Sequence, residues 1–134
     1  MAARGLLLDT HVWLWMNGEP ERLRADVRER LVRADEDLFL SAASAWEIGI
    51  KVALGKLSLP EPPERYLPSR LTRHQVSSLA VQQIHGLQAA ALPGHHRDPF
   101  DRLLVAQAQV DRLTLVTADG QLGSYDVELL WAGA

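Results

Sequence analysis

Short apolar runs alternate along the chain with longer amphipathic stretches. The runs at residues 5–9, 38–40, 113–117 and 127–131 are typical of strands buried on both faces of a parallel sheet. Residues 75–79 form a further candidate strand. Because strands that alternate with helices favour a mostly parallel sheet covered on both sides, the pattern predicts an α/β fold.

Six stretches between these runs are predicted to be helical. Residues 12–16 are apolar almost all round and end at Asn17-Gly18, a common helix stop. Residues 21–35 place Leu23, Val27 and Leu31 on one stripe, as in an amphipathic helix. The other helices are expected at residues 43–54, 63–73 and 81–92 and from about residue 99 onward.

Length and composition are those of one soluble globular domain spanning residues 1–134, with 47% hydrophobic and 23% charged residues. The chain has no cysteine, which excludes disulfides and thiolate metal sites and permits a reducing cytosol. We find neither a bilayer-spanning run nor a secretory leader, so we expect a cytoplasmic protein without a membrane partner. The net charge of -3 means that any nucleic-acid partner requires a local basic patch or a bound cation.

Four acidic residues fall near the predicted carboxyl ends of strands, where open α/β sheets form their ligand sites. Asp9 ends the first strand, and Glu47 follows the second strand in its helix. Asp101 lies in the first turn of the helix that begins near residue 99, and Asp119 follows the strand at 113–117. The sequence therefore predicts that these four carboxylates meet at one edge of the sheet.

Three of these acids also have purely structural explanations, which the sequence leaves open. Asp9 could cap the following helix. Glu47 could complete a capping box with Ser44 or pair with Lys51 one turn later. Asp119 precedes Gly120 in a dipeptide that turns often use.

Asp101 is harder to explain structurally. It shares a helical face with Leu104, Val105 and Ala108, so its carboxylate should lean toward the core, where an acid needs a compensating partner. Asp98, by contrast, is well placed to be the N-cap of the same helix.

Electrostatic repulsion indicates what kind of partner the four acids need. Two carboxylates about 4 Å apart repel by roughly 4 kcal/mol at an effective dielectric constant of about 20. Four in one pocket would either protonate or bind a divalent cation, and an all-oxygen ligand set favours Mg²⁺ or Mn²⁺ over zinc. Such an ion polarises phosphoryl oxygens and activates water, which is the chemistry of phosphodiester cleavage.

The five histidines do not have the spacing of a zinc site, because no HExxH motif is present and His95 and His96 are adjacent. His95, His96, Arg97 and Arg102 either supply positive charge for a phosphate backbone or belong to a solvated loop.

Five segments together resemble one known family. They are Asp9-Thr-His-Val-Trp-Leu-Trp, Ser44-Ala-Trp-Glu-Ile, Lys51 with Leu54-Gly-Lys-Leu57, His96-Arg-Asp-Pro-Phe-Asp-Arg and Leu115-Val-Thr-Ala-Asp119. In this order they resemble PIN-domain proteins, and most of all the PilT N-terminal-like, VapC-type toxins of bacterial type II toxin–antitoxin pairs. The resemblance extends from the first predicted strand to the last.

The resemblance implies a three-layer α/β/α sandwich and an endoribonuclease that depends on Mg²⁺ or Mn²⁺. By position, Asp9, Glu47, Asp101 and Asp119 match the family's acidic cluster, and Thr117 matches a residue that supports it. The small residues after Asp101 match the family's tightly packed helix. The family also implies an RNA substrate, a homodimer and a VapB-type antitoxin whose C-terminal tail blocks the site.

Other functions remain compatible with the sequence. One is a PIN nuclease that processes RNA without an antitoxin, and another is a non-catalytic PIN-like module that binds protein. A phosphatase with Asp9 as nucleophile is disfavoured, because His11 stands where such enzymes need a second aspartate. The RNA target and the number of metal ions are not fixed by the sequence.

Overall fold

The computed structural model describes residues 5–33 and 35–134 and contains a five-stranded sheet in the order β3-β2-β1-β4-β5. Every pairing between neighbouring strands is parallel, so the predicted α/β class is confirmed. The strands are β1 (Leu6–Leu8), β2 (Leu38–Ser41), β3 (Val76–Leu79), β4 (Thr114–Thr117) and β5 (Leu129–Trp131). The helices are α1 (Thr10–Gly18), α2 (Ala25–Val32), α3 (Ala42–Ala53), α4 (Pro63–His74), α5 (Gln83–Ala91) and α6 (Pro99–Asp111), with short 3₁₀ turns η1 (Pro20–Arg22) and η2 (Gly120–Ser124).

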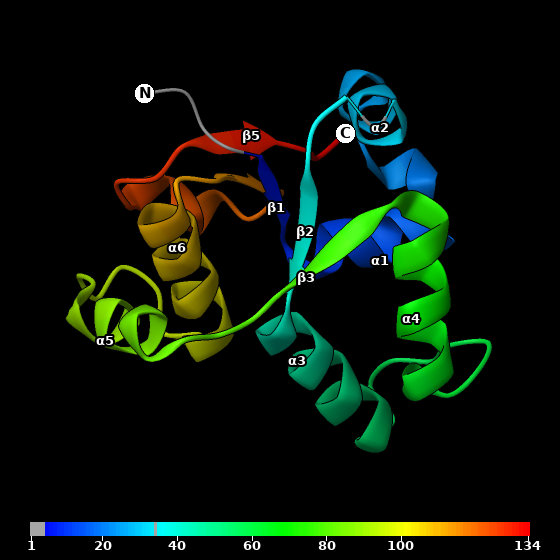
Figure 1. The fold of residues 1–134 in the computed structure, drawn as a ribbon, viewed down its shortest axis with the longest axis horizontal. Coiled ribbons are helices and arrows are strands. Elements are labelled where there is room, and N and C mark those ends of the chain that lie inside the picture. Colours follow the sequence, from blue (N-terminus) through cyan, green and yellow to red (C-terminus); the bar gives the residue numbers. More distant parts are fainter. Residues whose placement is uncertain (1–4, 34) are drawn as a thin grey trace.

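The molecule has three layers, with the sheet in the middle. Figure 1 shows α1, α2 and α4 on one side of the sheet and α5 and α6 on the other, with α3 beyond the end of β2. Alternate side chains of the central strands enter the two cores, as strand geometry requires. Leu6 and Leu8 pack with Trp13 in one core, and Leu7 packs with Val105 in the other.

The predicted helix at residues 21–35 is shorter than its hydrophobic stripe suggests. Leu23 is buried, yet it lies outside α2 and forms an isolated antiparallel bridge with Gly133. This pairing holds the chain extended, so α2 begins only at Ala25. The predicted helix also covers residue 34, which lies outside the described residues.

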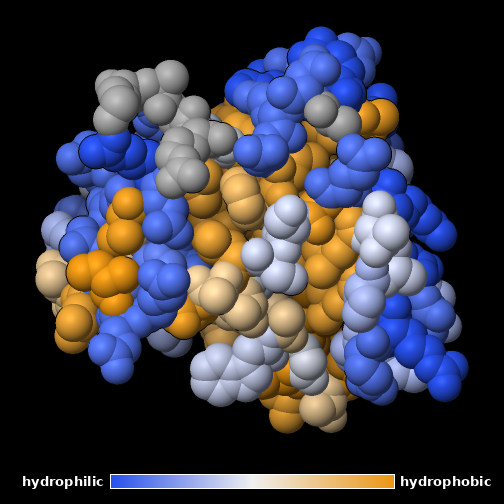
Figure 2. Space-filling view, in the orientation of Figure 1, coloured by the Kyte–Doolittle hydropathy of each residue, from blue (hydrophilic) through white to orange (hydrophobic). Residues whose placement is uncertain are grey.

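Several apolar side chains on and beside α3 and α5 are exposed. Trp46 in α3, Leu54 directly after α3, and Ile84 and Leu87 in α5 are each at least half exposed. Figure 2 shows hydrophobic residues on one face of the molecule, both along its middle and over α5, with hydrophilic residues over α2 and α4. In the described part of the chain, no helix combines the length and the apolar character needed to cross a membrane.

The order of the strands creates a crevice beside β1. The chain adds β2 and β3 on one side of β1 and then returns to add β4 and β5 on the other side. The chain leaves β1 into α1, which packs in one core, and leaves β4 into η2, which packs in the other core. Such switch points form ligand sites in open α/β sheets.

Candidate metal centre

Asp9 and Asp119 follow the two strands at this crevice. Asp9 comes directly after β1 and is only 3% exposed, and the hydroxyl of Thr117 donates a 2.7 Å hydrogen bond to its Oδ2. The Thr117 Oγ1 also accepts from the Asp119 amide at 3.0 Å. Asp9 occupies the N-cap position of α1, but its side chain makes no capping hydrogen bond, so capping does not explain the carboxylate.

One of the two carboxylate oxygens of Asp119 caps the turn that follows it. Its Oδ1 accepts from the amide of Gln121 at 2.9 Å and thereby caps η2, so the turn explanation holds for this oxygen. Asp119 and Asp9 nevertheless line one cavity of about 350 Å³, together with His11 and Trp15. The turn therefore fixes the orientation of Asp119 without removing it from the crevice.

Glu47 is buried in α3, where it is 6% exposed. Its Oε2 lies 3.0 Å from the Nζ of Lys51, which is the expected pair one helical turn apart. The alternative capping box with Ser44 does not form. Ser41 is the N-cap instead, and its side chain accepts from the amide of Ala43.

Asp98 and Asp101 lie close together at the start of α6 but differ in their contacts. The Asp98 Oδ1 accepts from the amides of Phe100 and Asp101 at the start of α6, so Asp98 is confirmed as the N-cap. The side chain of Asp101 is 15% exposed and turns inward from the helix.

The pKa values of two acids show that the carboxylates influence one another. Burial raises the pKa of Asp101 to about 7; the neighbouring carboxylates Asp9, Asp98 and Glu47 add to this rise, and His96 opposes it. Burial also raises the pKa of Asp9, with a further contribution from Glu47, against the hydrogen bond from Thr117 and the charge of His11. The carboxylates of Asp9, Glu47 and Asp101 therefore lie within electrostatic reach of each other.

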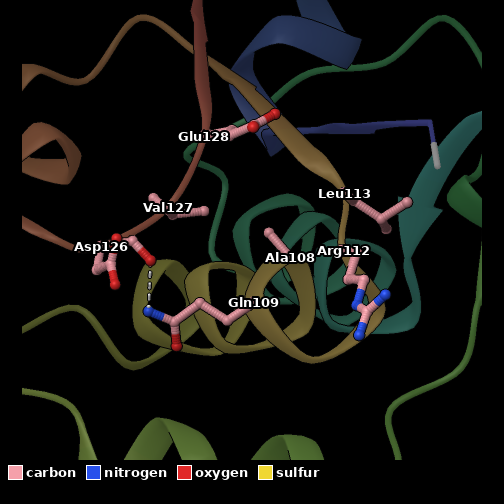
Figure 3. Close-up of a pocket in the computed structure, with 7 residues that line it drawn as sticks. All are labelled: Ala108, Gln109, Arg112, Leu113, Asp126, Val127 and Glu128. Carbon is pink, nitrogen blue, oxygen red and sulfur yellow. Dashed lines mark hydrogen bonds between the residues drawn. The ribbon is translucent and has the colours of Figure 1, made fainter. Parts of the chain in front are cut away.

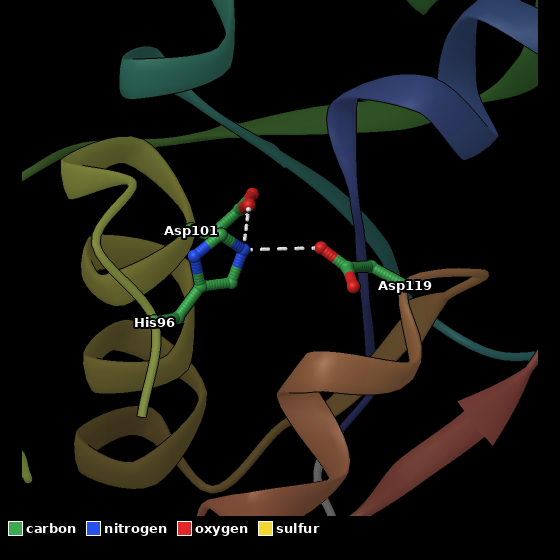
Figure 4. Close-up of side chains that lie close together, drawn as sticks. All are labelled: His96, Asp101 and Asp119. Atoms are coloured by element: carbon green, nitrogen blue, oxygen red, sulfur yellow. Dashed lines mark hydrogen bonds and ion pairs between the residues drawn. The ribbon is translucent and has the colours of Figure 1, made fainter. Parts of the chain in front are cut away.

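His96 connects the third and fourth acids, a contact that the sequence did not predict. Its Nε2 lies 2.9 Å from the Asp101 Oδ2 and 3.1 Å from the Asp119 Oδ2. Figure 4 shows the imidazole between the two carboxylates, one carried by α6 and the other by the loop after β4. Ligand atoms of these three residues all lie within 4.8 Å of one another. All four acids expected from the sequence are thus linked around one crevice.

This donor set fits a hard divalent cation. The four acids supply carboxylate oxygens, the ligands that Mg²⁺ and Mn²⁺ prefer. Lys51 brings one positive charge against four carboxylates, so excess negative charge remains when all four are ionised. Burial is the main cause of the raised pKa of Asp101, and the excess negative charge adds to it.

A cavity of about 400 Å³ lies at the opposite edge of the sheet, between the end of α6 and the start of β5 (Figure 3). Gln109 spans part of its mouth by donating to the carbonyl of Asp126 at 2.9 Å. Because this cavity adjoins the amino ends of the strands, it is separate from the acidic crevice.

Comparisons with known proteins agree with this architecture. The PIN domain family matches residues 6–128. Ribonuclease VapC22 of Mycobacterium tuberculosis is 33% identical over 121 residues, which are 90% of this chain and 91% of that protein. Ribonuclease VapC16 of the same organism is 52% identical over 48 residues, but this segment covers only 34% of VapC16.

Solved structures share the fold at lower sequence identity. VapBC2 from Rickettsia felis, bound to a DNA fragment from its promoter, matches with a TM-score of 0.71 and 16% identity, over 95% of this chain and 98% of that one. FitAcB from Neisseria gonorrhoeae matches with a TM-score of 0.61 and 22% identity, over 93% and 96% of the two chains. With the family match across nearly the whole chain, these findings establish that the protein belongs to the PIN-domain family and is similar to the VapC ribonucleases within it.

Proposed function

We propose that the protein is a divalent-metal-dependent endoribonuclease and the toxin of a type II toxin–antitoxin pair. The observation that carries the proposal is the gathering of Asp9, Glu47, Asp101 and Asp119 at the switch point of a PIN fold. The similarity to ribonuclease VapC22 along 91% of its length supports RNA as the substrate. We place its activity in the cytoplasm.

We assign Asp9, Asp101 and Asp119 as ligands of Mg²⁺ or Mn²⁺. A bound ion would supply Lewis acidity toward a phosphoryl oxygen and lower the pKa of water. Glu47 either joins the ligands or accepts a hydrogen bond from the attacking water, and Lys51 holds its carboxylate in place. Thr117 fixes the orientation of Asp9 by donating to its Oδ2.

The proposed partners are a VapB-type antitoxin and a second copy of the chain. A toxin–antitoxin complex from Klebsiella pneumoniae has the same fold, with a TM-score of 0.65, and supports the first partner. The exposed apolar side chains of α3 and α5, such as Trp46 and Leu87, offer a surface that a second copy would cover.

The test is RNA cleavage by the purified protein, free of antitoxin, in Mg²⁺ or Mn²⁺. We expect the wild type to cut a mixed RNA pool, EDTA to stop the reaction, and Asp101→Asn to lower the rate by at least about 100-fold. Asp126→Asn is the matched control, because it makes the same chemical change at an exposed position by the opposite edge of the sheet. Equal rates for Asp101→Asn and the wild type would refute the assignment of the site.

A further inference from the structure

The loop that carries His96 is fixed by Arg102 from within the fold. The Arg102 Nη2 donates to the carbonyls of Ala89 and Leu92, both at 2.9 Å, and its Nη1 donates to the carbonyl of Pro93 at 2.8 Å. Arg102 lies in α6 and its guanidinium is hydrogen-bonded, so the alternative that it belongs to a solvated loop is wrong. Arg102 instead ties the end of α5 and the following loop to α6.

The backbone of His96 is held on both sides. Its amide donates a 2.8 Å hydrogen bond to the hydroxyl of Tyr125, and its carbonyl accepts from the Arg102 Nη1 at 3.4 Å. Tyr125 is itself buried in the core beside α6. The position of His96 is therefore set before any ligand binds.

The hydrogen bonds of the ring also fix its tautomer. The amide of Asp98 donates to the Nδ1 of His96 at 3.2 Å, so Nδ1 carries a lone pair and the proton resides on Nε2. The same Nε2 faces Asp101 and Asp119, at 2.9 and 3.1 Å. A protonated Nε2 is a hydrogen-bond donor and cannot at the same time be a metal ligand.

One N–H group is thus shared by two carboxylates that would otherwise repel each other. Asp101 is carried by α6, and Asp119 is carried by the loop after β4, so no local backbone geometry sets their separation. Gln121 restrains the second oxygen of Asp119. Only 14% of the His96 side chain is exposed, so water competes weakly for these bonds.

We propose that His96 is a positioning residue of the acidic site. Its Nε2–H holds Asp101 and Asp119 at a spacing from which both carboxylates can serve one divalent ion. This inference rests on the proposed metal-dependent function and adds to the four acids a residue that acts through two of them. Outer contacts of this kind typically change metal affinity by about 10- to 100-fold when they are removed.

The experiment is a Mn²⁺ titration followed by electron paramagnetic resonance, with the antitoxin-free protein at one fixed pH. We expect His96→Ala to bind Mn²⁺ about 10- to 100-fold more weakly than the wild type. His96→Gln should recover most of this loss, because its amide N–H reaches a position similar to that of Nε2. His95→Ala is the matched control, since His95 is the neighbouring histidine, is exposed, and packs its ring edge-on against Tyr125. Circular dichroism verifies that each variant is folded.

Several results would overturn the inference. Equal affinity in His96→Ala and the wild type would show that His96 positions nothing, and tighter binding in His96→Ala would show that His96 competes with the ion. A directly coordinated ¹⁴N signal in the pulsed spectrum of the wild type would make His96 a ligand instead. A wild-type protein that binds no Mn²⁺ would refute the proposed function itself, and the inference with it.

Discussion

Replacing Asp101 by asparagine should stabilise the metal-free protein while it removes function. The pKa of Asp101 is raised to about 7 by burial and by neighbouring carboxylates, so ionising this group costs the native state free energy. Asparagine has nearly the same shape and remains neutral. At neutral and alkaline pH, ionised Asp101 therefore lowers the free energy of unfolding of the wild type, and the variant lacks this effect.

The magnitude follows from linkage between proton binding and folding. Between the ordinary pKa of 3.8 and the raised pKa of about 7, the native state binds more protons than the unfolded chain, so wild-type stability falls as the pH rises through this window. A difference of about three pKa units corresponds to about 4 kcal/mol. Screening by solvent at the crevice lowers this, and we expect about 2–4 kcal/mol.

The assay is urea unfolding in EDTA at about pH 4.5 and pH 8.5. The free energy of unfolding of Asp101→Asn, relative to the wild type, should increase by about 2–4 kcal/mol between the two pH values. Mn²⁺ should then restore wild-type stability, by about 2.7 kcal/mol at 100 times the dissociation constant, and should not affect the variant. A difference between the two proteins that does not change with pH would refute the argument that burial and neighbouring carboxylates disfavour the ionised form of Asp101.

Three further predictions concern the support of the site, the assembly and the fold. Thr117→Val removes the buried donor to Asp9 and should weaken Mn²⁺ binding about 10-fold in a calorimetric titration, whereas Thr117→Ser should retain it. Leu87→Glu places a charge on the exposed apolar face of α5 and should convert the proposed dimer to a monomer in light scattering, unless that face is not the interface. Gly5→Ala brings a Cβ to 2.7 Å from the Asp37 carbonyl and should lower the free energy of unfolding by about 1–3 kcal/mol in urea, while unchanged stability would mean that the strand shifts freely.

The fold could be predicted from the sequence because its strands are buried on both faces. Leu6, Leu7 and Leu8 are all apolar, and alternate members enter different cores. An all-apolar strand is typical of a central strand that is covered on both faces. The boundary of α2 could not be predicted in the same way. The hydrophobic stripe correctly indicates that Leu23 is buried. The backbone of Leu23 is nevertheless extended, because it pairs with Gly133 at the far end of the chain.

The grouping of the four acids at one edge of the sheet could be predicted, because a parallel topology brings the carboxyl ends of the strands together. The competing structural roles were decided by the directions of side chains, which the sequence does not specify. Asp9 turns from its helix toward Thr117, and Ser41 rather than Ser44 begins α3. Asp119 fills both roles, since one oxygen caps η2 and the other faces His96.

His96 lay beyond sequence reasoning because its conformation depends on tertiary contacts. From the sequence alone, a histidine in a loop is expected to be solvated. The structure shows instead that Tyr125 and Arg102 hydrogen-bond to the backbone of His96 and hold it in place. Contacts of the acidic side chains themselves reduce the repulsion within the crevice. The Nε2–H of His96 lies between two carboxylates that would otherwise repel, and Lys51 neutralises a third. Burial and the neighbouring carboxylates still raise the pKa of Asp101 to about 7, so a bound cation would stabilise its ionised form.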